Sequence, residues 1–241
     1  MKVALLGYGK MGQAIEQELL DEATSHEIIL RIDSDNRSEL TLESLSAADV
    51  AIEFSTPDSA IENIKMCFEA NVPVVSGTTG WLRHLSAIKQ LCREKNQTLF
   101  YATNYSVGVN IFFEMTRKLA EFMNQQEHYD VSIDEIHHIH KLDKPSGTGI
   151  TTAEILLDQL DRKGDWKLDE APSSSDIAIY SHRQEEVPGT HTVTFTHPID
   201  TIRLSHEAHS RAGFVKGAIA AAKWVKDKKG VFGMKDMLGI G

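Results

Sequence analysis

Short apolar runs recur along the first part of the chain, and stretches with helical periodicity separate them. A continuous apolar run is typical of a strand that is buried on both faces. Strands are predicted at Val3–Leu6, Glu27–Ile32, Val50–Phe54, Val72–Ser76 and Thr98–Ala102, and helices at Met11–Glu22, 57–70 and Leu82–Lys95. Strands that alternate with helices in this way predict an α/β fold with a parallel, doubly wound sheet.

The pattern changes after Tyr105, where the last three predicted strands follow one another with no helix between them. Helices are expected at Val109–Gln125 and Thr151–Asp161, and strands at Tyr129–Ile136, Ile177–Arg183, Gly189–His197 and Asp200–Ala208. Consecutive strands joined by short turns predict a mixed or antiparallel sheet in a second, α+β domain. A last helix, Ala212–Lys226, is expected to pack back on the first domain. The predicted domains are residues 1–106 with 213–241, and residues 107–212.

Composition and charge narrow the classes of partner. The chain has 241 residues and a formal net charge of −10, which argues against nucleic acid or an anionic membrane as its partner. The N-terminal run MKVALLGYG is too short for a signal peptide, and no stretch approaches the ~20 apolar residues of a membrane helix. Cys67 and Cys92 lack metal-ligand spacing and are expected to be reduced core residues. These features predict a cytoplasmic protein.

A glycine-rich segment lies directly after the first predicted strand and opens a helix. It fits the pattern G-x-G-x-x-G with Gly7, Tyr8, Gly9, Lys10, Met11 and Gly12. In such a loop the first glycine permits a tight turn, the second lets backbone approach a pyrophosphate, and the third allows the helix to pack closely on the strand. The helix N-terminus then faces the phosphates. The segment predicts a Rossmann-type dinucleotide-binding domain, and the alternative is a glycine turn that binds nothing.

Asp33 ends the second predicted strand, ~20 residues after the glycine loop. Its carboxylate would accept hydrogen bonds from the ribose hydroxyls of NADH and would repel the 2′-phosphate of NADPH. NADH is therefore favoured over NADPH as the cofactor, although the nearby Arg37 softens the preference. The alternative is a solvated carboxylate at a strand end.

Two further loops follow predicted strands at the carboxyl edge, where ligands of open α/β sheets bind. Their amides and hydroxyls are expected to border the nicotinamide, and the alternative is a pair of plain strand-to-helix turns. The residues are Gly77, Thr78, Thr79, Ala102, Thr103, Asn104 and Tyr105.

Residues 135–149, EIHHIHKLDKPSGTG, gather three histidines and two lysines beside a turn rich in backbone amides. Along a strand, His137 and Lys141 share one side, whereas His138 and His140 share the other. A metal site is one interpretation, but no cysteine or clearly placed carboxylate completes a ligand set. A solvated basic surface is the second. The third is a site for an anionic substrate, in which imidazoles donate protons, a lysine supplies charge and the following helix start cradles an anion.

This run closely resembles the signature E-x-H-H-x-x-K-x-D-x-P-S-G-T of the 4-hydroxy-tetrahydrodipicolinate reductase family, also called the dihydrodipicolinate reductase family. Other stretches agree with the family: GYGKMG, GTTG, ATNYSVGVN at 102–110 and SRAGFVKGAI near the C-terminus. The resemblance covers nearly the whole chain, and its histidine–lysine signature is highly specific.

The resemblance implies an enzyme of the diaminopimelate route to lysine that uses NADH or NADPH to reduce a cyclic dicarboxylate with loss of water. It implies that His137 is the proton donor and acceptor and that Lys141 is the second acid. His138, Gly147 and Thr148 would hold the substrate carboxylates, no metal is expected, and the glycine loop, Asp33 and the two further loops would contact the cofactor. It also implies a homotetramer assembled through the sheet of the second domain, which would be the substrate-binding and oligomerisation domain.

The chain departs from the family pattern around the ribose position. The segment between Asp33 and Asp49 is short, and Asp33-Ser34 stands where many relatives have Glu-Arg, which weakens any case for a strong NADPH preference. Two rival functions are a nicotinamide-binding sensor without catalysis and another imine or amino-acid dehydrogenase. Neither explains the histidine–lysine run.

Overall fold

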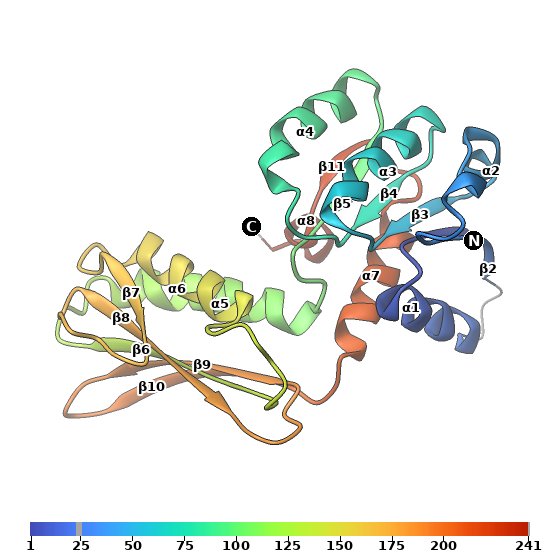
Figure 1. Ribbon diagram of the computed structural model, residues 1–241. Helices are drawn as coiled ribbons and strands as arrows, with labels where there is room; N and C mark the ends of the chain where they lie inside the picture. The colour runs from blue at the N-terminus through green and yellow to red at the C-terminus, as the bar shows by residue number, and fades with distance from the viewer. Residues whose placement is uncertain (23–25, 241) are drawn as a thin grey trace. The chain divides into compact units, whose positions relative to one another are not determined.

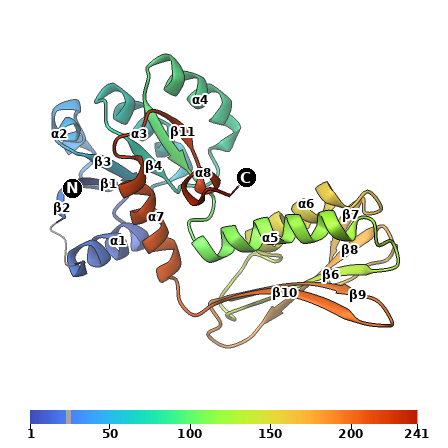
Figure 2. The same cartoon turned by 180° about the vertical axis from the view of Figure 1, so that it is seen from behind.

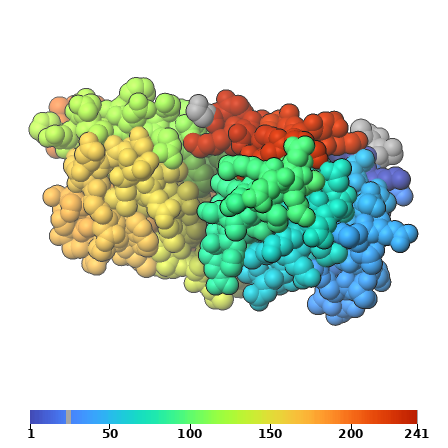
Figure 3. Space-filling view, turned by 90° about the horizontal axis from the view of Figure 1, so that it is seen from above, coloured from blue at the N-terminus to red at the C-terminus, as the bar shows by residue number. Residues whose placement is uncertain are grey.

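The computed structural model describes residues 1–22 and 26–240. The chain divides into two compact units, Met1–Val107 with Ala212–Gly241 and Gly108–Arg211, and each is built on its own sheet (Figure 1). In the space-filling view the C-terminal segment, in red, lies against the green and cyan segments of the first unit (Figure 3). The roles predicted for the two parts, dinucleotide binding for one and substrate binding with oligomerisation for the other, stay predictions.

Six parallel strands form the sheet of the first unit, in the order β11-β5-β4-β3-β1-β2. They are β1 (Lys2–Leu6), β2 (Glu27–Ile32), β3 (Val50–Glu53), β4 (Val74–Ser76), β5 (Thr98–Tyr101) and β11 (Gly230–Phe232). The predicted parallel α/β sheet is thus confirmed. The sequence pattern does not predict β11, because its three residues are too few to show a period.

Helices cover both faces of this sheet (Figures 1 and 2). They are α1 (Lys10–Asp21), α2 (Leu42–Ser46), α3 (Pro57–Glu69), α4 (Leu85–Glu94), α7 (Ala212–Val225) and α8 (Met234–Leu238), with single 3₁₀ turns at Arg37–Glu39 and Leu82–His84. Alternate residues of β1 enter different cores: Leu6 packs with α3 and α4, whereas Leu5 packs with α1 and α7. The last long helix therefore packs on the first unit as predicted. Cys67 and Cys92 are buried and free.

Five strands form a mixed sheet in the second unit, in the order β10-β9-β6-β8-β7, and two helices cover one face of it (Figure 1). The elements are α5 (Val107–Met123), β6 (Asp130–His137), α6 (Gly147–Gln159), β7 (Asp165–Leu168), β8 (Asp176–Arg183), β9 (Gly189–Thr196) and β10 (Thr201–Ala208). β8 runs parallel to β6, whereas β9 runs antiparallel to it, so the prediction of a mixed sheet is confirmed. Because β6 lies between β8 and β9, the connection 184–188 crosses the carboxyl end of β6.

The start of α6 differs from the prediction. The sequence pattern places the helix start at Thr151, whereas α6 begins at Gly147. The side chain of Ser146 caps it, since its hydroxyl oxygen accepts a hydrogen bond from the Gly149 N–H at 3.0 Å. Two glycines hide this turn from the helical pattern, because glycine is a weak helix former. The sequence also leaves β7 unpredicted, because four residues at a sheet edge show no clear alternation.

The two faces of β6 differ in chemistry. Val131, Ile133, Glu135 and His137 are buried on one face, whereas the residues between them are only partly buried. Successive strand residues point to opposite faces, so Glu135 and His137 continue the row that begins with two core aliphatic residues. The strand thus carries its polar groups into the buried side of the sheet, at the carboxyl end.

Lys163 is a buried cation that ties the loop before β8 to the start of β6. Its Nζ donates to Asp130 Oδ1 at 2.7 Å, to the Ser174 carbonyl oxygen at 2.7 Å and to the Asp176 carbonyl oxygen at 3.0 Å. We expect Lys163→Met to lower the free energy of unfolding by about 1–3 kcal/mol, because it leaves two carbonyl oxygens without a donor. Urea denaturation followed by circular dichroism measures this change.

The control is Lys167→Met, which removes an exposed lysine paired with Asp165 in the same unit. It should leave the urea midpoint unchanged, since surface ion pairs contribute little. Equal midpoints for the two variants would contradict the structural role given to Lys163.

Candidate active site

Glu135 is a carboxylate that the fold buries completely. The Ser146 N–H donates to both of its oxygens at 3.0 Å, the Ser146 hydroxyl donates to Oε2, and the Ser181 hydroxyl donates to Oε1 at 2.6 Å. Burial raises the pKa of Glu135, but the hydrogen bonds from the two serines outweigh it, and the pKa lies below its ordinary value. Glu135 is therefore ionised at neutral pH, inside the unit.

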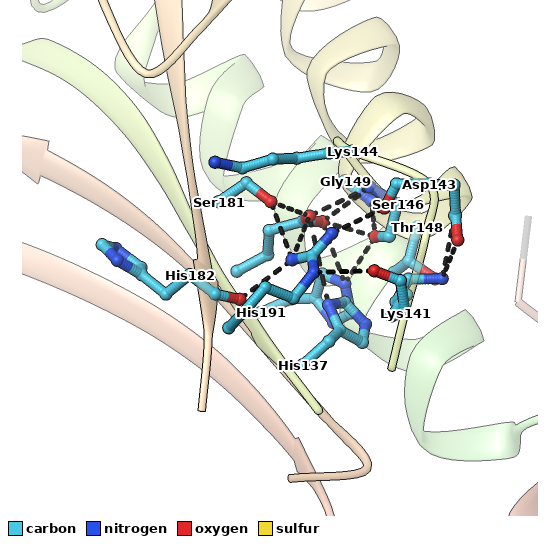
Figure 4. A network of polar contacts seen from close by, with 12 residues as sticks. His137, Lys141, Asp143, Lys144, Ser146, Thr148, Gly149, Ser181, His182 and His191 are labelled. Carbon is cyan, nitrogen blue, oxygen red and sulfur yellow. Dashed lines mark hydrogen bonds and ion pairs between the residues drawn. The ribbon is translucent and has the colours of Figure 1, made fainter. Parts of the chain in front are cut away.

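The register of the sheet brings these groups together. Glu135 stands opposite Ser181 of β8 on one side and opposite His191 of β9 on the other. Residues opposite each other in neighbouring strands point to the same face. Figure 4 shows Ser146, Ser181 and His191 directed toward one another at this point of the sheet. The cluster is thus one row of side chains across three strands, closed by the start of α6.

His191 is a neutral member of this cluster. Its Nε2 lies 3.1 Å from the Ser146 hydroxyl oxygen, which already donates its hydrogen to Glu135. His191 must therefore donate from Nε2, and its buried Nδ1, which has no hydrogen-bond partner among the described residues, carries no proton. Burial, with the positive charge of a protonated His137 as a second cause, lowers the pKa of His191 to about 3.

His137 is the last residue of β6 and is buried beneath the connection that follows β8. Its carbonyl oxygen accepts from the Gln184 N–H at 2.8 Å. A Cβ on Gly189 would lie 3.2 Å from His137 Nε2. His137 Nδ1 is 4.0 Å from Glu135 Oε1, which is too far for a hydrogen bond but close enough for Coulomb attraction. The imidazole therefore has a fixed place, and its Nδ1 has no hydrogen-bond partner in the part of the chain that the structure describes.

Four charges and burial compete over the protonation of His137. Burial lowers the pKa of His137, Glu135 raises it, Lys141 and Arg183 lower it, and Asp143 raises it. The pKa lies below its ordinary value. Burial is the largest cause, and the attraction of Glu135 is the main opposing one.

Lys141 lies on the loop between β6 and α6, and Arg183 holds this loop. Lys141 Nζ donates to both Asp143 oxygens at 2.8 Å. Arg183 Nε donates to the Lys141 carbonyl oxygen at 3.2 Å, and its Nη2 donates to the Asp143 carbonyl oxygen at 2.6 Å. The guanidinium thus fixes the main chain that carries the lysine ammonium.

The first turn of α6 leaves two amides for a ligand. The Ser146 N–H is taken by Glu135, the Gly149 N–H by the Ser146 hydroxyl and the Ile150 N–H by the Ser146 carbonyl oxygen. The amides of Gly147 and Thr148 lie between them and have no intrahelical acceptor, as at any helix start. Together with the helix dipole they suit a carboxylate or another anion.

The other two histidines of the run contact other side chains. His138 Nε2 is 3.1 Å from Arg211 Nη2. His140 is largely exposed, and its Nε2 is 3.5 Å from Glu186 Oε1. The chain turns directly after His137, since the Lys141 N–H donates to the His138 carbonyl oxygen, so the strand alternation predicted to place these side chains ends there.

A carboxylate does stand beside two histidines, contrary to the expectation that none would. Ligand atoms of Glu135, His137 and His191 lie within 4.8 Å of one another. Both carboxylate oxygens, however, already accept hydrogen bonds from serine donors, and a cation would have to displace them. The geometry therefore favours a hydrogen-bonded anion beside an imidazole over a metal site.

Sequence reasoning missed three members of this site: Ser181, Arg183 and His191. They lie on β8 and β9, outside the signature run, and reach it only through strand pairing. The alternation of buried residues along β9, in which His191 precedes Val193 and Phe195 on one face, is the signal that could have indicated His191.

The first unit contains a cavity of about 490 Å³ at the carboxyl ends of β1, β2 and β3. Four residues predicted to contact a cofactor line it: Gly7, Tyr8, Gly9 and Asp33. Asp33 is exposed there, and only its Oδ1 accepts hydrogen bonds from the described main chain, from Asp35 at 2.9 Å and Asn36 at 3.3 Å. No described residue donates to its Oδ2, which can accept from a ligand hydroxyl.

Arg37 lines the same cavity. Its Nη1 donates to Asn63 Oδ1, and its Nη2 lies 3.2 Å from Glu62 Oε2. Lys10, Met11 and Gly12 lie beyond the cavity, in the first turn of α1.

The loops after β4 and β5 meet at Ser76. The Ala102 N–H and the Tyr105 hydroxyl both donate to the Ser76 carbonyl oxygen, at 3.3 and 2.7 Å. The Thr78 hydroxyl donates to the fully buried Glu53 at 2.9 Å and accepts from the Ser55 N–H at 2.8 Å. That hydroxyl is therefore occupied within the protein, and this loop has mainly its amides to offer a ligand. Gly77, Thr79, Thr103 and Asn104 belong to the same two loops, beyond the cavity lining.

The three glycines of the loop differ in what they do for the fold. A Cβ on Gly7, whose φ is +101°, would overlap the Phe54 carbonyl group, and a Cβ on Gly12 would overlap the Gly7 carbonyl oxygen. A Cβ on Gly9 would meet nothing within 4 Å, and its φ of −81° suits any residue. Packing thus explains the first and third glycines, whereas the second leaves open space beside the cavity.

Comparison with known proteins gives one consistent result. The family models described as dihydrodipicolinate reductase, N-terminus, and dihydrodipicolinate reductase, C-terminus, match residues 1–105 and 108–238. A protein of Christiangramia forsetii named 4-hydroxy-tetrahydrodipicolinate reductase is 48% identical over 99% of this chain and 98% of its own length. One of the same name from Methanoculleus marisnigri is 33% identical over the full length of both.

A solved structure described as dipicolinate-bound dihydrodipicolinate reductase from Paenisporosarcina superposes with a TM-score of 0.80 at 24% identity, over 97% of each chain. A probable dehydrogenase from Thermotoga maritima superposes with a TM-score of 0.55 at 10% identity, over 98% of this chain and 92% of its own. At these identities the two likenesses concern the fold. None of the described helices is both long and apolar enough to cross a bilayer.

The different surroundings of Gly9 and Gly12 give a pair of predictions. Gly9→Ala should leave the free energy of unfolding unchanged but weaken NADH binding, because the new methyl group enters space that only a ligand would fill. Gly12→Ala should lower the free energy of unfolding by about 1–3 kcal/mol, because it forces the helix away from the turn. Urea denaturation and a fluorescence titration with NADH measure the two effects. Wild-type NADH affinity in Gly9→Ala would contradict the assignment of the cavity.

Proposed function

The chain belongs to the dihydrodipicolinate reductase family, and on that premise we propose that it reduces (2S,4S)-4-hydroxy-2,3,4,5-tetrahydrodipicolinate to tetrahydrodipicolinate with NAD(P)H, in the diaminopimelate route to lysine. The observation that carries the proposal is the buried imidazole of His137, which interacts electrostatically with Lys141 and lies near the start of α6 with its two amides that lack an intrahelical acceptor (Figure 4). This group combines a proton donor with an anion site, and the reduction of a dicarboxylate requires both.

The reaction divides between the cofactor and the chain. Loss of water from the 4-hydroxy substrate gives a conjugated imine, and bound reduced nicotinamide supplies the hydride that adds at C4. The addition leaves an electron pair on the substrate, and this pair must be protonated. Protonated His137 donates that proton, and the cations of Lys141 and the imidazolium offset the negative charge that develops.

The substrate carboxylates need fixed partners. The Gly147 and Thr148 amides, freed by the way Ser146 caps α6, bind one carboxylate, and the Thr148 hydroxyl adds a donor. His138 contributes a further donor. Lys141, now paired with the exposed Asp143, exchanges that partner for the substrate dianion, and the dianion raises the pKa of His137 when it binds.

NADH is the preferred cofactor in this proposal. Asp33 lines the cavity with one carboxylate oxygen open to ribose hydroxyls, and its charge repels a 2′-phosphate. Arg37 lines the same cavity and moderates this repulsion, but it is already engaged with Asn63. The cofactor residues in this proposal are the glycine loop, Asp33 and the loops after β4 and β5.

The proposed assembly is a homotetramer in the cytoplasm. Among the described residues, the helices of the second unit cover one face of its sheet (Figure 1). Asp134, Tyr180 and Thr192 lie on the other face, opposite one another in the register. A face of paired strands without helices of its own suits contact with a second copy. The support for this assembly is the family resemblance together with that open face.

His137→Gln and Lys141→Met test the chemistry. We expect each to lower kcat by about 10²–10⁴-fold, as loss of a general acid does, with the KM for NADH unchanged. His140→Gln is the matched control, because His140 is exposed and outside the cluster, and it should keep wild-type turnover. NADH oxidation after addition of freshly generated substrate measures all three. Wild-type turnover in His137→Gln, or no turnover in the wild type, would overturn the proposal.

Asp33→Asn tests the cofactor preference. It should lower the ratio of kcat/KM for NADH to that for NADPH by about tenfold, because it removes both the ribose acceptor and the repulsion of the 2′-phosphate. Asp35→Asn removes a charge two residues away, outside the cavity lining, and should leave the ratio unchanged. A ratio that moves equally in both variants would point to net charge rather than to ribose contact.

A further inference from the structure

The proposed chemistry uses His137, Lys141 and two amides, and it leaves the buried Glu135 without a role. We propose that Glu135 is the positioning residue of this site, whose carboxylate both anchors the start of α6 and favours the protonated form of His137. The inference rests on the proposed function, because it concerns how the proton donor and the anion site of that function are kept in place.

The anchoring follows from the hydrogen bonds of the helix start. Glu135 accepts from Ser146 twice, from its N–H and from its hydroxyl. With its hydrogen directed at Glu135, the Ser146 hydroxyl can only accept from the Gly149 N–H, and this contact caps the helix. The carboxylate thus determines which amides form hydrogen bonds within the protein, and it leaves those of Gly147 and Thr148 for the substrate.

The electrostatic part follows from burial and distance. Glu135 Oε1 lies 4.0 Å from His137 Nδ1, and both side chains are buried, so solvent screens the attraction weakly. The other groups that face His137 are Lys141 and Asp143 on the following loop, Arg183 on β8, and His191 on β9, which is neutral. Glu135 and Asp143 are the anions among them, and Asp143 is bound to Lys141.

A purely structural Glu135 would behave differently from a positioning one. As a structural residue it would support folding through its hydrogen bonds alone, and its charge would not matter to His137. As a positioning residue it affects the proton affinity of His137 through its charge and the substrate affinity through Ser146. Two variants separate these effects: Glu135→Gln removes the charge at nearly constant shape, and Ser181→Ala removes one hydrogen bond but keeps the charge.

The experiment measures the pKa of His137 directly, by NMR titration of protein labelled at the histidine ring carbons, with His137→Gln used to assign the signal. Glu135→Gln should lower this pKa by about one unit, the size of effect that a close opposite charge has. Ser181→Ala should leave it near the wild-type value. An unchanged pKa in Glu135→Gln, or an equal shift in Ser181→Ala, would overturn the proposal.

The same variants have a kinetic readout with a defined sign. If protonated His137 is the form that acts, kcat/KM falls as the pH rises through its pKa. A lower pKa moves this basic limb to lower pH, so Glu135→Gln should have its limb about one unit below that of the wild type, and Ser181→Ala should not. A limb that stays in place in Glu135→Gln counts against the proposal.

Glu135→Asp is the second variant, and it serves if Glu135→Gln does not fold. It keeps the charge but withdraws the carboxylate from Ser146, so the pKa of His137 should change little while the KM for the dicarboxylate rises about tenfold at unchanged KM for NADH. A wild-type KM for the dicarboxylate would reject the anchoring of α6. The titration needs no turnover, so it can be done whether or not the wild type is active. If the wild type does not reduce the substrate but Glu135→Gln still lowers the pKa of His137, the proposed function is refuted and the positioning role stands.

Discussion

A charge buried in a protein persists only where enough donors converge on it, because removing an ion from water costs several kcal/mol. Glu135 is such a charge, with no exposed surface and with serine donors around both oxygens. The burial and the hydrogen bonds that this carboxylate requires constrain three elements at once. Strand alternation places it on the helix-covered face of β6, strand register supplies Ser181, and α6 must begin where the Ser146 N–H can reach it. The position of the amides that are proposed to bind an anion is a consequence of that third requirement.

The first unit meets the same constraint in the same way. Glu53 ends β3, is fully buried, and accepts from the hydroxyls of Ser55, Ser76 and Thr78. These donors belong to the loops after β3 and to the end of β4 with its following loop, so one carboxylate joins two segments at the carboxyl edge of the sheet. Among the described residues, no cation pairs with it. Each unit therefore keeps its proposed ligand loops rigid by fixing them to a buried anion rather than to a flexible surface contact.

The sequence predicts the features that depend on local order. Apolar runs and glycines were enough for the parallel sheet and for the loop after β1, since both depend on residues close together in the chain. β7 and β11 were too short to show a period, and the start of α6 was hidden by two glycines whose helical conformation depends on the Ser146 cap. The partners of Glu135 were beyond reach for another reason. His191 follows β8 in the chain, yet it contacts β6 because β6 lies between β8 and β9, and strand order is a property of the whole sheet.

The spacing of the signature run becomes intelligible once these partners are known. Glu135 and His137 are two residues apart, so they share one face of β6 and their charges interact directly. Ser146 comes immediately before Gly147 and Thr148. The residue that binds the Glu135 carboxylate therefore also caps the helix, and the next two amides have no acceptor within it. Lys141 lies between these two pairs in the sequence. Arg183 holds the main chain of its loop and does not bind the lysine ammonium. The run thus combines two anchoring residues, which bind each other, with His137 and Lys141, the two residues that are proposed to act on the substrate. A substitution of Glu135 or Ser146 should therefore affect the chemistry without touching a reacting atom, which is how a buried hydrogen-bonded pair can be as decisive for a site as the groups that react.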